Sequence, residues 1–113
     1  MREPLKFSGI MPANILPFKA DLSIDEPAYR RHLRWLADTP GVTGIVANGH
    51  AAEVASLSRE ECKRTLAVAL DEVAGACPIV AGVYTDGLRR TRRPGAPPAC
   101  CCFRRRSSCG VRR

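Results

Sequence analysis

Short apolar runs alternate along this chain with longer segments in which apolar residues recur every three to four positions. Three apolar runs, at residues 9–13, 42–47 and 78–83, have the length and composition of strands. The second and third are apolar nearly throughout, which is typical of parallel strands covered on both faces. The segments between the runs are long enough for right-handed helical crossovers. The pattern therefore predicts an α/β fold in the order β-α-β-α-β.

The first helical segment is expected to begin at Ser23, which is followed three residues later by a glutamate. This spacing predicts a capping box with Ser23 as the N-cap, and Asp25 is a competing N-cap. Pro27 suits the first turn, and Pro40-Gly41 ends the helix. One face carries the residues that recur with the helical period: Ala28, Tyr29, His32, Leu33, Leu36 and Ala37. We interpret His32 as a half-buried structural histidine and not as a ligand.

The second helical segment begins with a cleaner capping box, in which Ser58 precedes Glu61 by three residues. Gly75 is a natural stop for this helix, and a proline follows shortly after it. Its expected buried stripe consists of Cys62, Leu66, Ala69, Leu70 and Val73. Within that stripe Cys62 is interpreted as a small apolar group.

The loop after the second strand is the candidate functional site, with the sequence Gly49-His50-Ala51-Ala52-Glu53. Ligands of α/β folds bind in the loops that follow the carboxyl ends of strands. A histidine and a carboxylate three residues apart on such a loop are able to handle protons or orient a substrate. The alternative is structural: Gly49 makes the turn, His50 lies in solvent, and Glu53 favours the start of the next helix.

Composition changes sharply near Gly87. Residues 1–87 have a net charge of −2, whereas residues 88–113 contain nine arginines and no acidic residue, a charge of +9. We therefore divide the chain into a folded part, 1–87, and a basic tail, 88–113. The tail shows no apolar period, so it is predicted to be disordered.

Targeting signals and membrane spans are not predicted. The chain contains no run of 18 apolar residues. The first six residues are not followed by the apolar region of a secretory signal, so a cytoplasmic location is expected.

Five segments of the folded part resemble the dihydrodipicolinate synthase and N-acetylneuraminate lyase family. In particular, Gly49-His50-Ala51-Ala52-Glu53 is similar to the Gly-Thr-Thr-Gly-Glu signature of that family. The five segments follow one another in the expected order and spacing: 7–13 with 16–18, 22–25, 44–53, 57–61 and 78–83.

The resemblance implies a (β/α)₈ TIM barrel that acts as a class I aldolase or lyase on pyruvate-like 2-keto acids, usually as a homo-oligomer and without a metal or other cofactor. It also implies a Schiff-base lysine on the sixth strand and a proton-relaying tyrosine on the fifth. The signature loop holds the substrate carboxylate, which assigns substrate binding to Gly49, His50, Ala51, Ala52 and Glu53.

The chain departs from the family pattern within the signature itself. His50 and Ala51 occupy the two hydroxyl positions, and Ala52 replaces the second glycine. The backbone N–H groups of Ala51 and Ala52 are still expected to face a carboxylate, and His50 is able to relay a proton near neutral pH. This departure favours a divergent subfamily that acts on a 2-keto acid other than the substrate of dihydrodipicolinate synthesis.

The second departure concerns length, because a barrel of this type needs about 250 residues. Residues 1–87 supply the first three strands and two helices of such a barrel. The Schiff-base lysine and the relay tyrosine of the family lie on the sixth and fifth strands, which are beyond these three. None of the lysines (Lys6, Lys19 and Lys63) and neither tyrosine (Tyr29 and Tyr84) matches those positions. We therefore expect a partial barrel and an inactive amino-terminal fragment with no catalytic residue of its own.

The tail has three possible origins or roles. A frameshift in a GC-rich gene explains a segment with no Lys, Asn, Asp or Glu, and we favour it. A basic nucleic-acid-binding arm is the main alternative function, although Phe103 is its only aromatic residue for base stacking. A metal site is disfavoured because the four tail cysteines lack Cys-x-x-Cys spacing: Cys100, Cys101, Cys102 and Cys109.

Overall fold

The computed structural model describes residues 7–73 and 75–83, together with the backbone of residues 100–103. These residues form two helices, α1 (Glu26–Asp38) and α2 (Arg59–Val73), and the strands β1 (Ile45–Ala47), β2 (Ile79–Gly82) and β3 (Cys100–Phe103). Two short 3₁₀ helices, η1 (His50–Ala52) and η2 (Val54–Ser56), lie between β1 and α2. Neither α-helix of this described part is long and apolar enough to cross a membrane.

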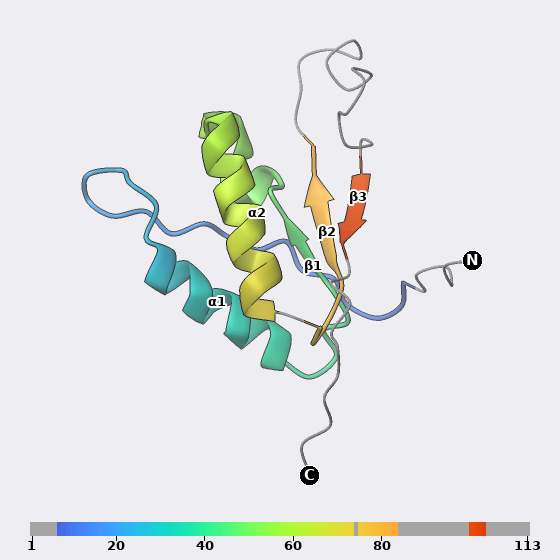
Figure 1. The fold of residues 1–113 in the computed structure, drawn as a ribbon. Helices are drawn as coiled ribbons and strands as arrows, with labels where there is room; N and C mark the ends of the chain where they lie inside the picture. Colours follow the sequence, from blue (N-terminus) through green and yellow to red (C-terminus); the bar gives the residue numbers. More distant parts are fainter. Residues whose placement is uncertain (1–6, 74, 84–99, 104–113) are drawn as a thin grey trace.

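The core lies between the helices and one face of the sheet. β1 and β2 pair in parallel, with Ile45 opposite Ile79 and Ala47 opposite Ala81, and these four side chains are buried. α1 and α2 lie side by side over this face (Figure 1). The intervening Val46 is only half-buried, because the described helices cover one face of the sheet. The expectation of strands covered on both faces is therefore met on one face only.

The predicted first strand, 9–13, is interrupted in the structure. Its residues form two isolated parallel bridges, Ile10 with Val42 and Ala13 with Val46. Between the two bridges the chain advances three residues on one side and four on the other, so regular pairing is not maintained. Pro12 has no N–H to donate to the neighbouring segment, although its carbonyl accepts a bond of 2.9 Å from the Val46 N–H. The mismatch also explains why β1 is shorter than the predicted 42–47.

The two helix starts differ in how well they follow the sequence pattern. At α2 the capping box is confirmed, since the Ser58 N–H donates to the Glu61 carboxylate (2.7 Å) and the Glu61 N–H donates to the Ser58 hydroxyl (3.2 Å). At α1 the prediction of Ser23 as N-cap is wrong. Asp25 is the N-cap and accepts from the Ala28 N–H at 3.0 Å, while the Ser23 N–H and hydroxyl both bond to Asp21.

The buried face of α2 is rotated relative to the predicted stripe. Thr65 and Val68, which the stripe omitted, are each 2% exposed, and Ala69 and Val73 are buried as predicted. Cys62, Leu66 and Leu70 are half-buried at the edge of this face. The reason is that α2 packs against both α1 and the sheet, so the buried arc is wider than a single row of apolar residues.

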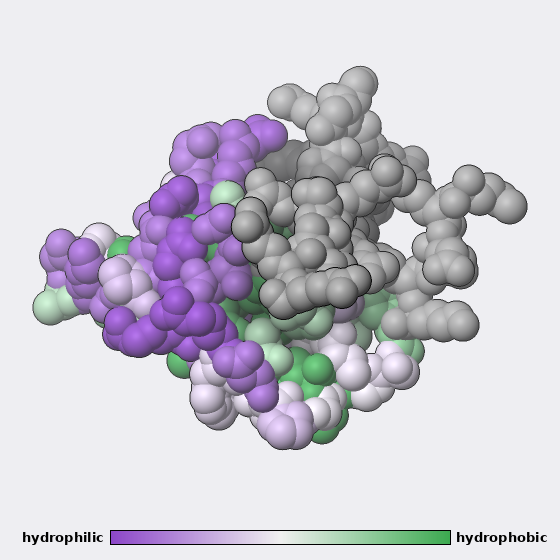
Figure 2. Space-filling view, turned by 60° about the horizontal axis from the view of Figure 1, so that its bottom comes forward, coloured by the Kyte–Doolittle hydropathy of each residue, from purple (hydrophilic) through white to green (hydrophobic). Residues whose placement is uncertain are grey.

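Ion pairs join the exposed sides of α1 and α2. Arg30 and Arg34 of α1 and Arg64 of α2 contact carboxylates at 2.8–3.1 Å: Glu26, Asp71 and Glu72. Figure 2 shows hydrophilic residues gathered on one side of the molecule and more hydrophobic ones reaching the surface beside them. The larger exposed apolar side chains are Phe7, Ile10, Ile15, Phe18, Leu22, Trp35 and Val83.

Four residues of the tail correct the prediction of disorder over 88–113. The Cys100–Phe103 backbone forms β3, antiparallel to β2, with Ile79 opposite Phe103 and Gly82 opposite Cys100. The edge of β2 that faces away from β1 presents unpaired backbone groups, which explains why a short apolar run pairs there. The other tail residues lie outside the described part, as do the boundary at Gly87, the arginines of the proposed basic arm and Cys109.

Candidate functional site

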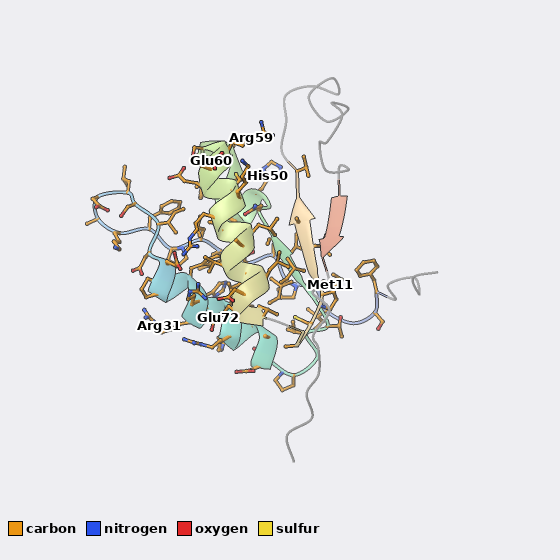
Figure 3. The ribbon with its side chains drawn as sticks, in the orientation of Figure 1. Met11, Arg31, His50, Arg59, Glu60 and Glu72 are labelled. Atoms are coloured by element: carbon orange, nitrogen blue, oxygen red, sulfur yellow. The ribbon has the colours of Figure 1, made fainter. Side chains whose placement is uncertain are left out.

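The candidate loop follows the carboxyl end of β1 and lies beside the end of β2. Gly82, the last residue of β2, has no Cβ, and the carbonyl of Asn48 occupies the space that a Cβ would need. Figure 3 shows His50 at the end of the molecule where α2 begins with Arg59 and Glu60. The loop therefore has the position that ligand-binding loops take in α/β folds.

Two non-glycine residues in the left-handed conformation bracket the loop. Asn48 has φ 55° and Glu53 has φ 56° and ψ 32°. Gly49 between them is extended, and η1 follows it as a single tight turn. A left-handed conformation is uncommon for residues other than glycine, and such residues concentrate at functional sites. Between Ala47 and Val54 the chain thus makes two sharp changes of direction.

The five predicted site residues differ in how they are presented. His50, Ala51 and Glu53 have exposed side chains, and Gly49 is half-buried. Ala52 is 2% exposed, and its N–H donates to the Gly49 carbonyl at 3.1 Å. This internal bond removes the Ala52 N–H from the carboxylate donors expected from the sequence. The Glu53 N–H is likewise used, at 3.1 Å from the His50 carbonyl.

Asn48 is the residue of this site that the sequence interpretation missed. It is 6% exposed, and its side-chain amide donates to the Cys62 carbonyl at 2.9 Å. Its side-chain oxygen accepts from the Thr65 hydroxyl, also at 2.9 Å. An Asn-Gly pair directly after an apolar strand is a turn signal that pointed to the conformation. No local pattern in the sequence indicated its two partners on α2, the Cys62 carbonyl and the Thr65 hydroxyl.

The other titratable side chains near the core are structural. His32 is half-buried as predicted, its Nε2 accepts from the Ile15 N–H at 3.2 Å, and burial lowers its pKa. Burial raises the pKa of Tyr29 to about 12, against a smaller opposing effect of its bond to Asn14. Burial, with a contribution from Glu61, raises the pKa of Cys62, so this thiol is not an activated nucleophile.

Comparisons with known proteins find a family and several relatives over most of the chain. The model of the dihydrodipicolinate synthetase family matches residues 6–91. The chain is 38% identical over 93 residues to a probable 5-dehydro-4-deoxyglucarate dehydratase of a Bradyrhizobium species. This alignment covers 81% of the chain and 29% of the relative. It is 42% identical over 76 residues to the 4-hydroxy-tetrahydrodipicolinate synthase of Methanothrix thermoacetophila. This second alignment covers 67% of the chain and 25% of the relative.

A solved structure is similar over the same part of the chain. The N-acetylneuraminate lyase of Mycoplasma synoviae superimposes with a TM-score of 0.69 at 25% identity, covering 75% of this chain and 29% of that one. The chain thus spans between a quarter and a third of the length of these relatives. On the family match and on these identities together, the chain belongs to the dihydrodipicolinate synthetase family.

Proposed function

We propose that this chain is the amino-terminal part of a (β/α)₈ barrel lyase or synthase that acts on pyruvate-type 2-keto acids, and that residues 49–53 bind the substrate carboxylate. One observation carries the proposal: the left-handed residues Asn48 and Glu53 bracket an exposed loop at the carboxyl end of β1. A conformation that costs free energy is expected where a loop must present its backbone to a ligand.

The proposed contacts come from the exposed residues of the loop. His50 and Ala51 face outward, so the His50 imidazole and the Ala51 backbone are the groups that we assign to the carboxylate. Because the Ala52 N–H is bonded within the loop, Ala52 contributes by closing the turn and not by donating to substrate. Glu53 then orients the substrate or exchanges a proton with it.

The proposed substrate is a 2-keto acid that differs from the one used in dihydrodipicolinate synthesis. Two features support this choice: the loop lacks the two hydroxyl side chains of the family signature, and one relative is a probable 5-dehydro-4-deoxyglucarate dehydratase. The compound in that name is an oxidised sugar acid, which combines a keto group with a carboxylate. We therefore propose a keto sugar acid of this class as the natural substrate of the complete barrel.

We propose further that the 113 residues perform no turnover by themselves. In a class I aldolase, a lysine forms an imine with the keto carbon, and the protonated imine stabilises the adjacent carbanion. Lys19 is exposed, Lys63 is paired with Glu60 at 2.9 Å, and neither belongs to a strand. Homo-oligomerisation remains a prediction from the resemblance, and a cytoplasmic location remains a prediction from the sequence alone. The nucleic-acid alternative depends on tail arginines outside the described residues, and no observation favours it.

Carboxylate binding is tested by nuclear magnetic resonance on the full chain. Pyruvate is titrated into ¹⁵N-labelled protein, with acetate as a carboxylate that lacks the keto group. We expect the amide signals of residues 49–53 to move with both ligands and further with pyruvate, and His50→Ala to weaken the response. A titration that moves no amide of this loop would overturn the proposal.

A further inference from the structure

We infer that Asn48 is the positioning residue of the candidate loop: its side-chain amide anchors the loop to α2, so that residues 49–53 are already arranged for a carboxylate before it binds. The inference rests on the proposed function for the identity of the ligand. The anchoring itself rests only on contacts that Asn48 makes with three elements of the fold.

The side chain of Asn48 uses both of its polar atoms on α2. The Nδ2 group donates to the Cys62 carbonyl and the Oδ1 atom accepts from the Thr65 hydroxyl, each at 2.9 Å. Asn48 is 6% exposed and Thr65 is 2% exposed, so these bonds are largely shielded from water. Hydrogen bonds in such surroundings are stronger than at the surface, and an unpaired partner left behind would be costly.

The main chain of Asn48 is restrained as well. Its carbonyl lies against Gly82 of β2. A Cβ on any other residue at position 82 would collide with this carbonyl. Its φ of 55° turns the chain sharply away from the direction of β1. Asparagine tolerates this conformation better than most residues with a side chain. Asn48 therefore connects the end of β1, the end of β2 and the first half of α2.

Most of the other side chains of the loop lie at the surface. Among its residues, Ala52 is the buried one. The N–H groups of Ala52 and Glu53 bond within the loop, and the Glu53 carbonyl accepts from the Ser56 N–H at 2.8 Å. The side chains of His50, Ala51 and Glu53 are exposed. Asn48 directly precedes these groups, and its bonds to α2 therefore contribute to their orientation relative to the sheet. A loop arranged in advance loses less conformational freedom when a ligand binds.

The test compares three variants of the full chain by residue-resolved amide hydrogen exchange. Asn48→Gly retains access to the left-handed conformation but removes both side-chain bonds. Thr65→Val keeps the shape of the side chain and removes the hydroxyl donor. Val68→Ala is the matched control, because it destabilises the same helix from a core position that is 2% exposed and touches neither bond.

We expect Thr65→Val to speed exchange in residues 49–53 about tenfold, the effect of losing roughly one buried hydrogen bond, and Asn48→Gly, which removes both bonds, to speed it further. Amides in the middle of α2 should change by much less. In Val68→Ala the loop and the helix should change by a similar factor. Exchange in the loop that is unaltered by Asn48→Gly, or that changes only in proportion to α2 as in Val68→Ala, would overturn the inference.

Pyruvate titration of the same proteins separates this inference from the proposed function. If both are correct, Asn48→Gly weakens the pyruvate response of the loop about tenfold while the circular dichroism of the helices is unchanged. A role limited to folding would alter the two signals together and would contradict the inference. If the wild-type loop ignores pyruvate but loosens selectively in Asn48→Gly, the proposed ligand is wrong and the anchoring by Asn48 is supported.

Discussion

The carboxylate of Glu72 on α2 lies 2.8 Å from the guanidinium of Arg30 on α1, and this pair is the best-shielded ionic contact between the two helices. The Glu72 side chain is 12% exposed, whereas Asp71, which also contacts Arg30, is 62% exposed. Glu72 additionally pairs with Arg34 at 2.8 Å. Interactions with the carboxylates raise the pKa of Arg30, with Glu72 as the largest contributor.

This difference in shielding predicts unequal effects of removing the two charges. Glu72→Gln should lower the urea midpoint of unfolding clearly, because it leaves two arginines without their shared partner. Asp71→Asn, the matched control on the neighbouring residue, should change it little, since exposed ion pairs contribute little to stability. The measurement is urea unfolding followed by circular dichroism. Equal midpoints for the two variants would contradict the importance assigned to Glu72.

The contact between Gly82 and Asn48 predicts that the two glycines of the site tolerate alanine differently. A Cβ at Gly82 would collide with the Asn48 carbonyl, whereas a Cβ at Gly49 would meet nothing closer than Val46 at 3.9 Å. We expect Gly82→Ala to destabilise the fold by about 1–3 kcal/mol, the usual range for an overpacked site. Gly49→Ala should cost less, because φ there is −89°. Unfolding free energies that are the same in both variants would rule out the close approach.

The burial of the Tyr29 hydroxyl predicts that the folded chain loses stability at high pH. Its hydroxyl accepts from the Asn14 amide at 3.1 Å, and burial raises its pKa to about 12. Because the unfolded chain loses the phenolic proton near the ordinary value of 10, stability should fall as the pH rises from 10 through about 12. Tyr29→Phe should cost about 1 kcal/mol at neutral pH, the usual value of one hydrogen bond.

The check is urea unfolding of wild type and Tyr29→Phe at about pH 8 and about pH 11, on either side of the ordinary tyrosine pKa. The gap between the two proteins should narrow at the higher pH, because only the wild type loses stability there through this residue. A gap that stays constant would show that Tyr29 ionises as readily in the folded chain as in the unfolded one.

Comparison of the two helix starts shows what the sequence could decide by itself. Ser23 and Ser58 precede a glutamate by the same three residues, yet only Ser58 forms the capping box. At α1 the Ser23 hydroxyl donates to Asp21 at 2.6 Å, and Asp25 is free to cap the helix. Spacing thus predicted that a helix begins in each place, whereas competition between nearby carboxylates decided which residue caps it.

The candidate site also has one feature that the sequence could predict and one that it could not. Its position was predictable, because an apolar strand followed by Asn48-Gly49 indicates a turn at the end of a strand. The anchoring of Asn48 was not, since Thr65 lies 17 residues farther along the chain and is brought close only by packing of α2. The pairing of β3 with β2 also escaped prediction, because its register depends on an open edge and not on a local pattern.

His32 predicts an opposite dependence on pH to that of Tyr29. Its Nε2 accepts from the Ile15 N–H at 3.2 Å, and burial lowers its pKa below the ordinary value of 6.5. The unfolded chain therefore takes up the proton first, so this contribution to stability is complete above pH 6.5 and falls as the pH drops through the folded pKa. Titration of the imidazole signals by nuclear magnetic resonance should give this lower pKa, and His50→Ala assigns the second histidine. A midpoint at or above the ordinary value would contradict the account.

The last prediction concerns the proposal that the 113 residues perform no turnover by themselves. Imine formation at neutral pH requires a lysine whose amine is largely unprotonated, which proteins achieve by burial or by a nearby positive charge. Lys63 is exposed and lies 2.9 Å from the Glu60 carboxylate, so it is not buried and its described ionic partner is negatively charged. Lys19 is exposed beside the turn that precedes α1. Neither has the environment of a Schiff-base lysine.

We therefore expect borohydride treatment with pyruvate to give no stoichiometric adduct on the 113-residue chain, as judged by mass spectrometry of the intact protein. The matched control is Lys63→Arg, which keeps the charge and should leave the spectrum unchanged apart from the substitution. The mass of a labelled peptide would identify any lysine that does react. A single stoichiometric adduct on Lys6, Lys19 or Lys63 would overturn the proposal that this part of the barrel carries the carboxylate loop without the catalytic amine, because the amine would then be present in the same chain.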